Sequence, residues 1–344
     1  MKIVEYFEAD LSSRGLLLQG LRQCDWGAGK FLLGLLEDGK FDETLGGPGK
    51  LFFLLDGNNV VSFLTLTVQD CIALRDFTPW IGFVYTFPAC RGHRYAGLLL
   101  DHARKCAASK GFPFVFLASG HAGLYEKYGF SHWGNLPDIH GEDSRIYTAP
   151  AADITAAAEA VQRRASEVIR RSGIREAWES IGAEVNQVGS MATGLLMKHR
   201  DIDFHIYTDT LDPEESFKAI TKICADPNVS QLEYRNLAAT EEACLEWHIR
   251  YGLEGESWQI DMIQILKGSQ FDGYFERVAN RINAVLTPET RRTILELKYL
   301  TPENEHIPGI EYYQAVIAGG VRTRPEFSEW RKAHPADGIN LWCP

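Results

Sequence analysis

The clearest hydrophobic pattern in this sequence lies between residues 80 and 111. Residues 80–87 alternate β-branched and aromatic side chains, as strands do, and Pro88 ends the pattern because it has no N–H for a further ladder bond. Apolar residues at helical spacing then predict a helix from Tyr95 to about Lys110, ending at Gly111. The positions expected to face a sheet are Leu98, Leu99, Ala103, Cys106 and Ala107.

The same reading predicts a mixed sheet with flanking helices over residues 1–150. Residues 2–8 predict an edge strand, and residues 11–36 predict two short amphipathic helices that are broken near Asp25-Trp26-Gly27. A short helix is expected at Tyr125 and Tyr128. The remaining strands are expected at 51–55, 60–68, 112–117 and 145–148, the first two joined by the hairpin turn Asp56-Gly57-Asn58-Asn59.

Composition changes abruptly to alanine-rich at residues 149–160, which predicts a domain boundary near residue 150. The second half predicts strands at 202–208 and 258–263 under a cap of helices. These helices are expected at 274–285, 289–299 and 309–319. The fold class is therefore α/β (α+β) in two domains, residues 1–150 and 151–344.

The length of 344 residues suits two domains better than one core. The net charge of −11 argues against a general nucleic-acid or anionic-membrane binder, since both need a basic footprint. The start has no signal-peptide pattern and no apolar run is long enough to span a bilayer, so we expect a soluble cytoplasmic protein. Seven scattered cysteines are expected to be reduced thiols.

Small residues and positive charge meet at residues 91–97, where the predicted helix begins. The unpaired N–H groups of a first helical turn and the positive end of the helix dipole both favour an anion. Gly92, Ala96 and Gly97 let a ligand approach the backbone, and the arginines of the turn can add charge-assisted contacts. The pattern indicates a phosphate-binding turn.

This turn resembles the acetyl-coenzyme A signature of the GNAT family of N-acetyltransferases, Arg/Gln-x-x-Gly-x-Gly/Ala. Arg91, Arg94 and Ala96 stand at its defined positions, and Arg94 departs from the glycine that the family prefers. The run LYEKYGF at residues 124–130, preceded by a strand at 115–118, resembles a second motif of the same family. Two motifs in the right order and context carry the resemblance.

The resemblance implies an acetyltransferase that transfers an acetyl group from acetyl-coenzyme A to an amine of a small molecule or peptide. It implies Tyr125 as the acid that protonates the departing thiolate, with a packed aromatic as the alternative and Tyr128 in reserve. Asp70 and Asp76 are acidic candidates for a base that the sequence does not place. The residues implied to bind the coenzyme are Val84, Tyr85, Arg91, Gly92, His93, Arg94, Tyr95, Ala96 and Gly97.

A second set of chemical groups lies in residues 187–261. Side chains two apart on a strand project to the same face, so Asp201 and Asp203 converge and repel each other unless a cation lies between them. Asp261, in a later strand, can supply a third carboxylate. A pair of Mg²⁺ ions about 3.5–4 Å apart is the usual partner of such carboxylates in phosphoryl and nucleotidyl transfer.

Together with Gly189-Ser190, these carboxylates resemble the DNA-polymerase-β-like nucleotidyltransferase superfamily. The resemblance implies that Gly189 and Ser190 contact a nucleoside triphosphate and that the three aspartates hold magnesium. The alternatives are strand-end surface carboxylates with an ordinary buried Asp261, or a fold retained without activity. His199 and His205, near the acidic pair, are interpreted as surface or packing residues rather than ligands.

The sequence thus indicates an acetyl-coenzyme A-dependent N-acetyltransferase with a second, nucleotidyltransferase-like domain. The competing hypothesis is a sensor or regulator that binds acetyl-coenzyme A and a nucleotide without turnover. The basic run between Arg163 and Arg175 is interpreted as a solvated helix face rather than a nucleic-acid contact. Tyr312, Tyr313 and Arg322 are candidates for an acceptor pocket, although core packing suits the tyrosines better. Nothing in the sequence indicates an oligomeric state.

Overall fold

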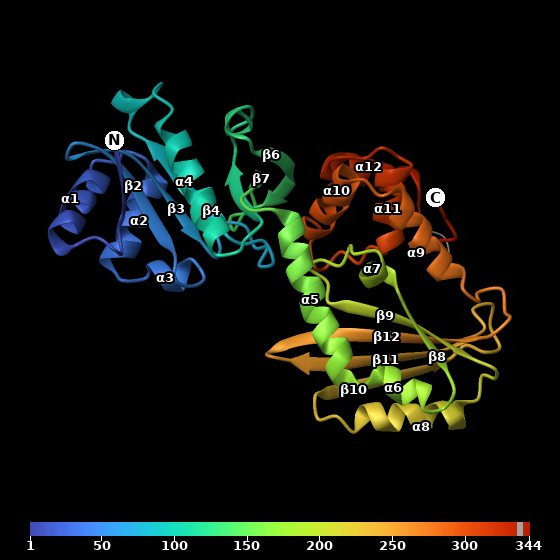
Figure 1. The fold of residues 1–344 in the computed structure, drawn as a ribbon. Helices are drawn as coiled ribbons and strands as arrows, with labels where there is room; N and C mark the ends of the chain where they lie inside the picture. Colours follow the sequence, from blue (N-terminus) through green and yellow to red (C-terminus); the bar gives the residue numbers. More distant parts are fainter. Residues whose placement is uncertain (336–339) are drawn as a thin grey trace. The chain divides into compact units, whose positions relative to one another are not determined.

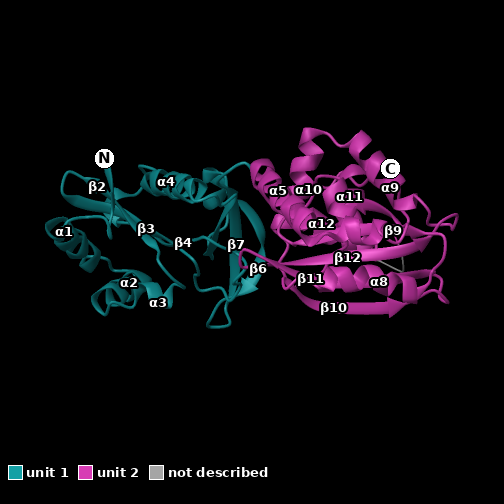
Figure 2. Cartoon of the chain, turned by 60° about the horizontal axis from the view of Figure 1, so that its bottom comes forward, with its two compact units in different colours: residues 1–153 teal, residues 154–344 magenta. Residues whose placement is uncertain are grey.

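The computed structural model describes residues 1–335 and 340–344. These residues divide into two compact units, 1–153 and 154–344 (Figure 2). Each unit is built on its own sheet, so the mixed α/β class expected from the sequence is confirmed. In the part of the chain that is described, no helix is both long enough and apolar enough to cross a membrane.

The sheet of the first unit has the order β1-β2-β3-β4-β5-β7-β6, with neighbours antiparallel except β4 and β5 (Figure 1). The hairpin at Gly57 and the edge position of β1 are confirmed. The strands are β1 (Lys2–Glu5), β2 (Lys50–Asp56), β3 (Asn59–Thr67), β4 (Trp80–Thr86), β5 (Phe114–Ser119), β6 (Ser131–Pro137) and β7 (Asp143–Pro150).

Helices cover both faces of this sheet because its strands are apolar on both sides. Phe52 and Leu54 of β2 pack toward α4, whereas Phe53 and Leu55 pack toward α1 and α2, following the period of two along a strand. The helical elements are α1 (Leu11–Arg22), α2 (Gly27–Glu37), α3 (Phe41–Thr44), η1 (Pro88–Cys90), α4 (Tyr95–Ser109) and η2 (Tyr125–Tyr128). The break between α1 and α2 falls at residues 23–26, as expected.

The sequence reading is wrong at some details of this unit. Leu98 does not face the sheet: it is 48% exposed, and Leu100, two residues later, is buried instead. Strand β5 begins only at Phe114, since Pro113 cannot donate a ladder bond. Strand β6 was not predicted, because its residues are mostly half-buried or exposed and carry no clear apolar alternation.

The sheet of the second unit has the order β10-β11-β12-β9-β8, and only β12 and β9 are parallel among its described pairs. Ile202, Phe204 and Ile206 of β9 face a core formed with α5, α6 and α8, so the residues between them face the opposite side. The strands are β8 (Glu184–Val188), β9 (Asp201–Thr208), β10 (Val229–Asn236), β11 (Cys244–Leu253) and β12 (Glu256–Leu266).

Contacts from α9, α10 and α11 reach the side of β9 that carries its aspartates (Figure 1). The three helices expected as a cap therefore exist, with bounds close to the predicted ones. The helices of this unit are α5 (Ile154–Ser172), α6 (Ile174–Glu179), α7 (Gly189–Ala192), α8 (Pro213–Cys224), α9 (Tyr274–Val285), α10 (Pro288–Tyr299), α11 (Gly309–Ile317) and α12 (Arg324–Ala333).

Candidate functional sites

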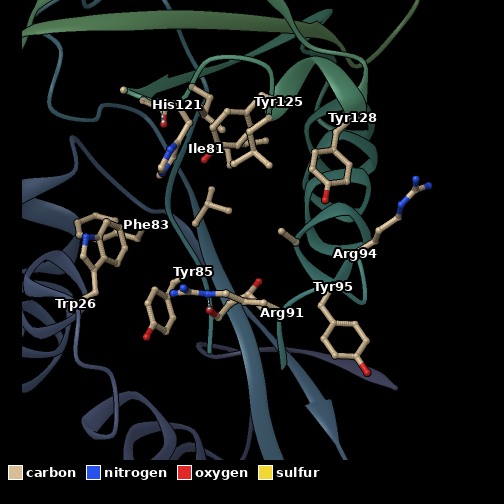
Figure 3. Close-up of a pocket in the computed structure, with 18 of the residues that line it drawn as sticks. Trp26, Ile81, Phe83, Tyr85, Arg91, Arg94, Tyr95, His121, Tyr125 and Tyr128 are labelled. Atoms are coloured by element: carbon tan, nitrogen blue, oxygen red, sulfur yellow. Dashed lines mark hydrogen bonds between the residues drawn. The ribbon is translucent and has the colours of Figure 1, made fainter. Parts of the chain in front are cut away.

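A cavity of about 920 Å³ lies where β4 and β5 separate in the first unit (Figure 3). In the described chain these parallel strands are in register at a single pair, Trp80 opposite Phe116. Beyond that pair, residues 81–86 line one side of the cavity and residues 117–121 line the other. The two strands diverge, and their backbones face the same space.

Strand β4 carries a β-bulge beside this cavity. Phe63 pairs with Tyr85 and Thr65 with Gly82, so β4 has one residue more than β3 between these pairs. Phe83 takes φ +50°, a conformation that costs energy for a side chain larger than glycine. A bulge releases its backbone from the ladder, and both Phe83 and Val84 line the cavity.

The predicted phosphate-binding turn forms one end of the cavity, at the first turn of α4. Arg94 precedes the helix with φ +59°, a left-handed conformation that glycine adopts without strain. A glycine therefore suits this position, and an arginine there holds a strained backbone conformation. A side chain on Gly92 would meet no atom within 4 Å, so this part of the turn stands open.

The cavity brings together most of the residues that were expected to bind the coenzyme. Two of them lie outside its lining. His93 stacks on Tyr95, with ring centroids 5.3 Å apart. Gly97 makes room for Tyr128, since a Cβ there would lie 2.5 Å from the tyrosine ring. The expected residues that do line the cavity are Val84, Tyr85, Arg91, Gly92, Arg94, Tyr95 and Ala96.

Tyr125 of η2 lines the cavity and is only 6% exposed. Burial is the main reason that the pKa of its phenol is raised, while a hydrogen bond with Ser119 acts in the opposite direction. The ring packs against Phe130 and Tyr147 at centroid distances of 6.0 and 5.6 Å. The phenol therefore faces the cavity, keeps its proton at neutral pH and is held in place by packing.

The sequence could not place Asp70, and the structure puts it directly behind the cavity wall. Gly82 lines the cavity, and a Cβ on Gly82 would lie 2.7 Å from Asp70 Oδ2 and 3.1 Å from Thr65 Oγ1. The Cys71 N–H donates to Asp70 Oδ1 at 2.7 Å. Desolvation raises the pKa of the Asp70 carboxyl to about 6, and the buried Thr65 hydroxyl has no hydrogen-bond partner among the described residues.

In the second unit the aspartates lie as the period-two argument predicted. Asp203 of β9 is the register partner of Asp261 of β12, and Gln259 is the partner of Asp201, so three carboxylates share one face of two adjacent strands. Burial and then the charge of Asp261 raise the pKa of Asp201. Burial, then Asp261 and Asp201, raise the pKa of Asp203 to about 7.

Asp261 is also bound by neighbours within the sheet. His248 Nδ1 lies 2.7 Å from its Oδ1, and the Gln259 amide donates to both of its oxygens at 3.0 Å. This hydrogen bond to the Asp261 carboxylate is the main reason that the pKa of His248 is raised. No group of three or more His, Cys, Asp or Glu side chains within residues 1–335 and 340–344 is arranged to hold a metal ion.

Gly189 and Ser190 lie beside these carboxylates. Gly189 has φ +64°, and a Cβ there would overlap Asp203 Oδ2, so only glycine allows this approach. The Lys298 ammonium donates to Ser190 Oγ and to the Leu195 carbonyl, both at 2.8 Å, although Lys298 is only 7% exposed. Sequence reasoning missed Lys298 because it lies in α10, far along the chain, where its spacing suggested only a helix face.

The remaining candidates make contacts with other side chains of the protein. His205 is buried against Phe275, and burial lowers its pKa to about 4. Arg170 and Arg171 bond Glu167 on the exposed surface of α5, as expected for a solvated face. Tyr312 stacks on Phe327 and is buried, whereas the Tyr313 hydroxyl lies 3.2 Å from Ser190 Oγ. Arg322 bonds Glu289.

The first unit thus has a sheet that opens around a cavity, with the first turn of α4 at one end. Within this unit, residues 18–130 match the model of the acetyltransferase (GNAT) family. The first unit therefore contains a GNAT acetyltransferase domain. No curated protein matches the chain.

Solved structures similar to this chain include several acetyltransferases. An aminoglycoside 6'-N-acetyltransferase complexed with coenzyme A is 14% identical, with a TM-score of 0.33, and the match covers 44% of this chain and 97% of that one. The Enterococcus faecium aminoglycoside 6'-N-acetyltransferase is 16% identical, with a TM-score of 0.32 and the same coverage. A GNAT acetyltransferase from Staphylococcus aureus Mu50 is 15% identical, with a TM-score of 0.32, over 44% and 98%.

Proposed function

We propose that the first unit is an acetyl-coenzyme A-dependent N-acetyltransferase that acts on an amine of a small molecule or peptide. The observation that carries this proposal is one continuous cavity that contains both the anion-binding turn and the buried phenol of Tyr125. A single elongated ligand with a phosphate end and a reactive end suits such a cavity.

The residues of the turn fit the coenzyme. Gly92 leaves the backbone open, and the first N–H groups of α4 point at the space where a pyrophosphate would bind. Arg91 and Arg94 both line the cavity and add positive charge. The exposed backbone edges of β4 and β5 would hold the arm of the coenzyme.

When bound, acetyl-coenzyme A supplies a thioester whose acyl carbon forms an amide with the acceptor nitrogen while the C–S bond breaks and the coenzyme leaves as a thiol. Tyr125 gives its proton to the departing sulfur, since a phenol with a pKa of 10 or above still holds it when a thiolate near 8.5 develops. Asp70, behind Gly82, takes the proton that the amine loses. Tyr125 then regains a proton from solvent and Asp70 releases one to solvent, so both groups return to their starting states.

Acetyl-coenzyme A is expected to raise the melting temperature of the full chain. At about 100 times Kd it contributes about 2.7 kcal/mol, which shifts Tm by about 5–10 °C for a unit of this size. The double variant Arg91→Ala, Ala96→Glu removes one charge and sets an anion against the phosphates, so the shift should vanish in differential scanning fluorimetry. An unchanged shift in a variant that is folded without ligand would place the coenzyme elsewhere.

Acetylation is expected to slow as the pH falls through about 6, because Asp70 accepts a proton only while its carboxylate is ionised and its pKa is about 6. Asp70→Asn should lower kcat about 100-fold and abolish this acidic limb. The measurement is kcat against pH at saturating acceptor. Asp76→Asn, which changes a nearby acid, is the control and should keep the wild-type profile; an unaltered profile in Asp70→Asn would remove Asp70 from the mechanism.

For the second unit we propose a Mg²⁺-dependent, nucleotidyltransferase-like domain that binds a nucleoside triphosphate. The observation in favour is that Asp201, Asp203 and Asp261 share one face of β9 and β12 beside Gly189 and a buried lysine. Their side chains are not arranged as a formed metal site among the described residues, so magnesium would have to draw them together. Burial and then the neighbouring carboxylates raise the pKa values of Asp201 and Asp203, and a bound cation would offset the repulsion between their charges. The carboxylates would hold magnesium, with which the domain would position the triphosphate, and Ser190 and Lys298 would contact its phosphates.

A sensor that binds these ligands without turnover is the competing function for both units. Formation of an acetylated amine separates the two for the first unit. Stabilisation by acetyl-coenzyme A with no product from any amine would favour the sensor.

A further inference from the structure

Three aromatic side chains, Trp26, Phe83 and Tyr85, line one end of the cavity in the first unit. Trp26 is 38% exposed although it is a large apolar side chain, and Phe31, outside the lining, is 55% exposed. Trp26 stacks on Tyr85 with ring centroids 5.8 Å apart and an interplanar angle of 6°. The centroid of the Phe83 ring lies 6.4 Å from that of Trp26 (Figure 3) and 6.5 Å from that of Phe31, so these rings form a continuous aromatic row.

Packing within the protein does not explain why these aromatic rings lie where they do. The ring of Phe83 is held there by a backbone with φ +50°, which is strained for phenylalanine. The break between α1 and α2 presents Trp26, which no tertiary core covers fully. Exposed aromatic side chains that line a cavity are typical of ligand contact rather than of core packing.

A carboxylate stands beside the row. Asp25 lines the same cavity and accepts a hydrogen bond from the Tyr85 hydroxyl at 2.5 Å. This bond is the main reason that the pKa of Asp25 is lowered, with smaller contributions from Arg91 and Lys30. Asp25 is therefore ionised at any pH at which an amine acetyltransferase works, and it places a fixed negative charge against the rings.

The row already accepts one cation. The guanidinium carbon of Arg91 lies 5.9 Å from the centroid of the Tyr85 ring, within the range of a cation–π contact. Arg91 belongs to the 91–97 turn, and its guanidinium contacts the Tyr85 ring. The other rings of the row, Trp26, Phe83 and Phe31, extend away from this contact. Aromatic faces and an ionised carboxylate together bind ammonium groups better than neutral or anionic ones.

We propose that the acceptor of the first unit carries a second cationic group besides the amine that is acetylated, and that Asp25 and the aromatic row formed by Trp26, Phe83, Phe31 and Tyr85 bind this group. The substrate class is thus a diamine or polyamine with an apolar spacer. The proposal rests on the acetyltransferase function proposed above. In this proposal the break between α1 and α2 selects the acceptor, and the 91–97 turn binds the acetyl donor, acetyl-coenzyme A.

The test compares cadaverine with n-pentylamine, which share a five-carbon chain and differ by one amine. The full-length wild-type protein should acetylate cadaverine with a kcat/KM at least about tenfold higher, mostly through KM. Asp25→Asn and Trp26→Ala should each remove this preference by raising KM for cadaverine, with kcat and the rate on n-pentylamine nearly unchanged. Trp26→Phe, which keeps an aromatic ring, should retain most of the preference for cadaverine.

Asp38→Asn, which neutralises an exposed acid at the end of α2 outside the cavity, is the matched control and should keep the preference. Equal use of both amines by the wild type, use of neither, or equal effects of Asp25→Asn on both amines would overturn the proposal. The thermal shift with acetyl-coenzyme A is measured on every variant. If the shift persists while selectivity is absent, the second-cation proposal alone fails; if the shift is absent too, the acetyltransferase function fails.

Discussion

Replacing Tyr125 with phenylalanine is expected to lower kcat about 100-fold or more while coenzyme affinity stays nearly unchanged. The phenol is buried at the cavity wall, its raised pKa keeps the proton in place, and its ring is fixed by Phe130 and Tyr147. Removing the hydroxyl deletes the proton donor without changing the ring that packs. The loss should therefore fall on the chemical step rather than on binding.

Steady-state kinetics with a saturating amine, together with the thermal shift by acetyl-coenzyme A, would measure both quantities. Tyr128→Phe is the matched control, because Tyr128 also lines the cavity on η2 but packs its ring against Gly97. If Tyr128→Phe lost the activity and Tyr125→Phe kept it, the acid would have to be reassigned. Equal turnover in both variants would mean that solvent protonates the thiolate.

Loss of magnesium-dependent triphosphate binding is the second large effect, expected for the double variant Asp201→Asn, Asp203→Asn. Both carboxylates have raised pKa values because they are buried close to other carboxylates, and a divalent cation would relieve that repulsion. Two amides cannot neutralise the cation. The folded state should survive, since the substitutions remove mutual repulsion without changing side-chain volume.

Calorimetric titration of the full chain with magnesium and a nucleoside triphosphate would test this. Asp209→Asn is the control, because Asp209 follows the same strand but is an exposed partner of Lys267. Circular dichroism would verify that both variants fold. Unaltered binding by the double variant, or a wild type that binds none of the common triphosphates with any divalent metal, would reject the assigned site and leave the sheet as a structural resemblance.

Local sequence patterns correctly predicted the strands and helices whose burial follows from neighbouring residues in the chain. Alternation located β4 and β9, and helical spacing located α4 and the cap helices, because burial repeats with the period of the element. The same period placed Asp201 and Asp203 on one face, and strand pairing then brought Asp261 alongside. Leu98 shows the limit, since a stripe of leucines at 98–100 does not state which of them turns outward.

Residues that act through contacts between distant segments could not be predicted. Asp70, in the connection after β3, approaches Gly82 of β4, and nothing at position 70 signals that approach. Lys298 reaches Ser190 from α10, and Asp25 meets Tyr85 from the α1–α2 break. Each is an ordinary charged residue in the sequence and acquires its role only when the sheet brings the partners together.

The separation of β4 from β5 has a further consequence for what occupies the cavity. Beyond Trp80 and Phe116, β4 and β5 no longer pair, and their edges face each other across the cavity. The sheet is interrupted there, although β4 still pairs with β3 and β5 with β7. An exposed edge is a template for hydrogen bonding to an extended chain of amides. A ligand arm that carries amide groups can therefore act as a missing strand, and its binding would complete the sheet that the polypeptide leaves unfinished.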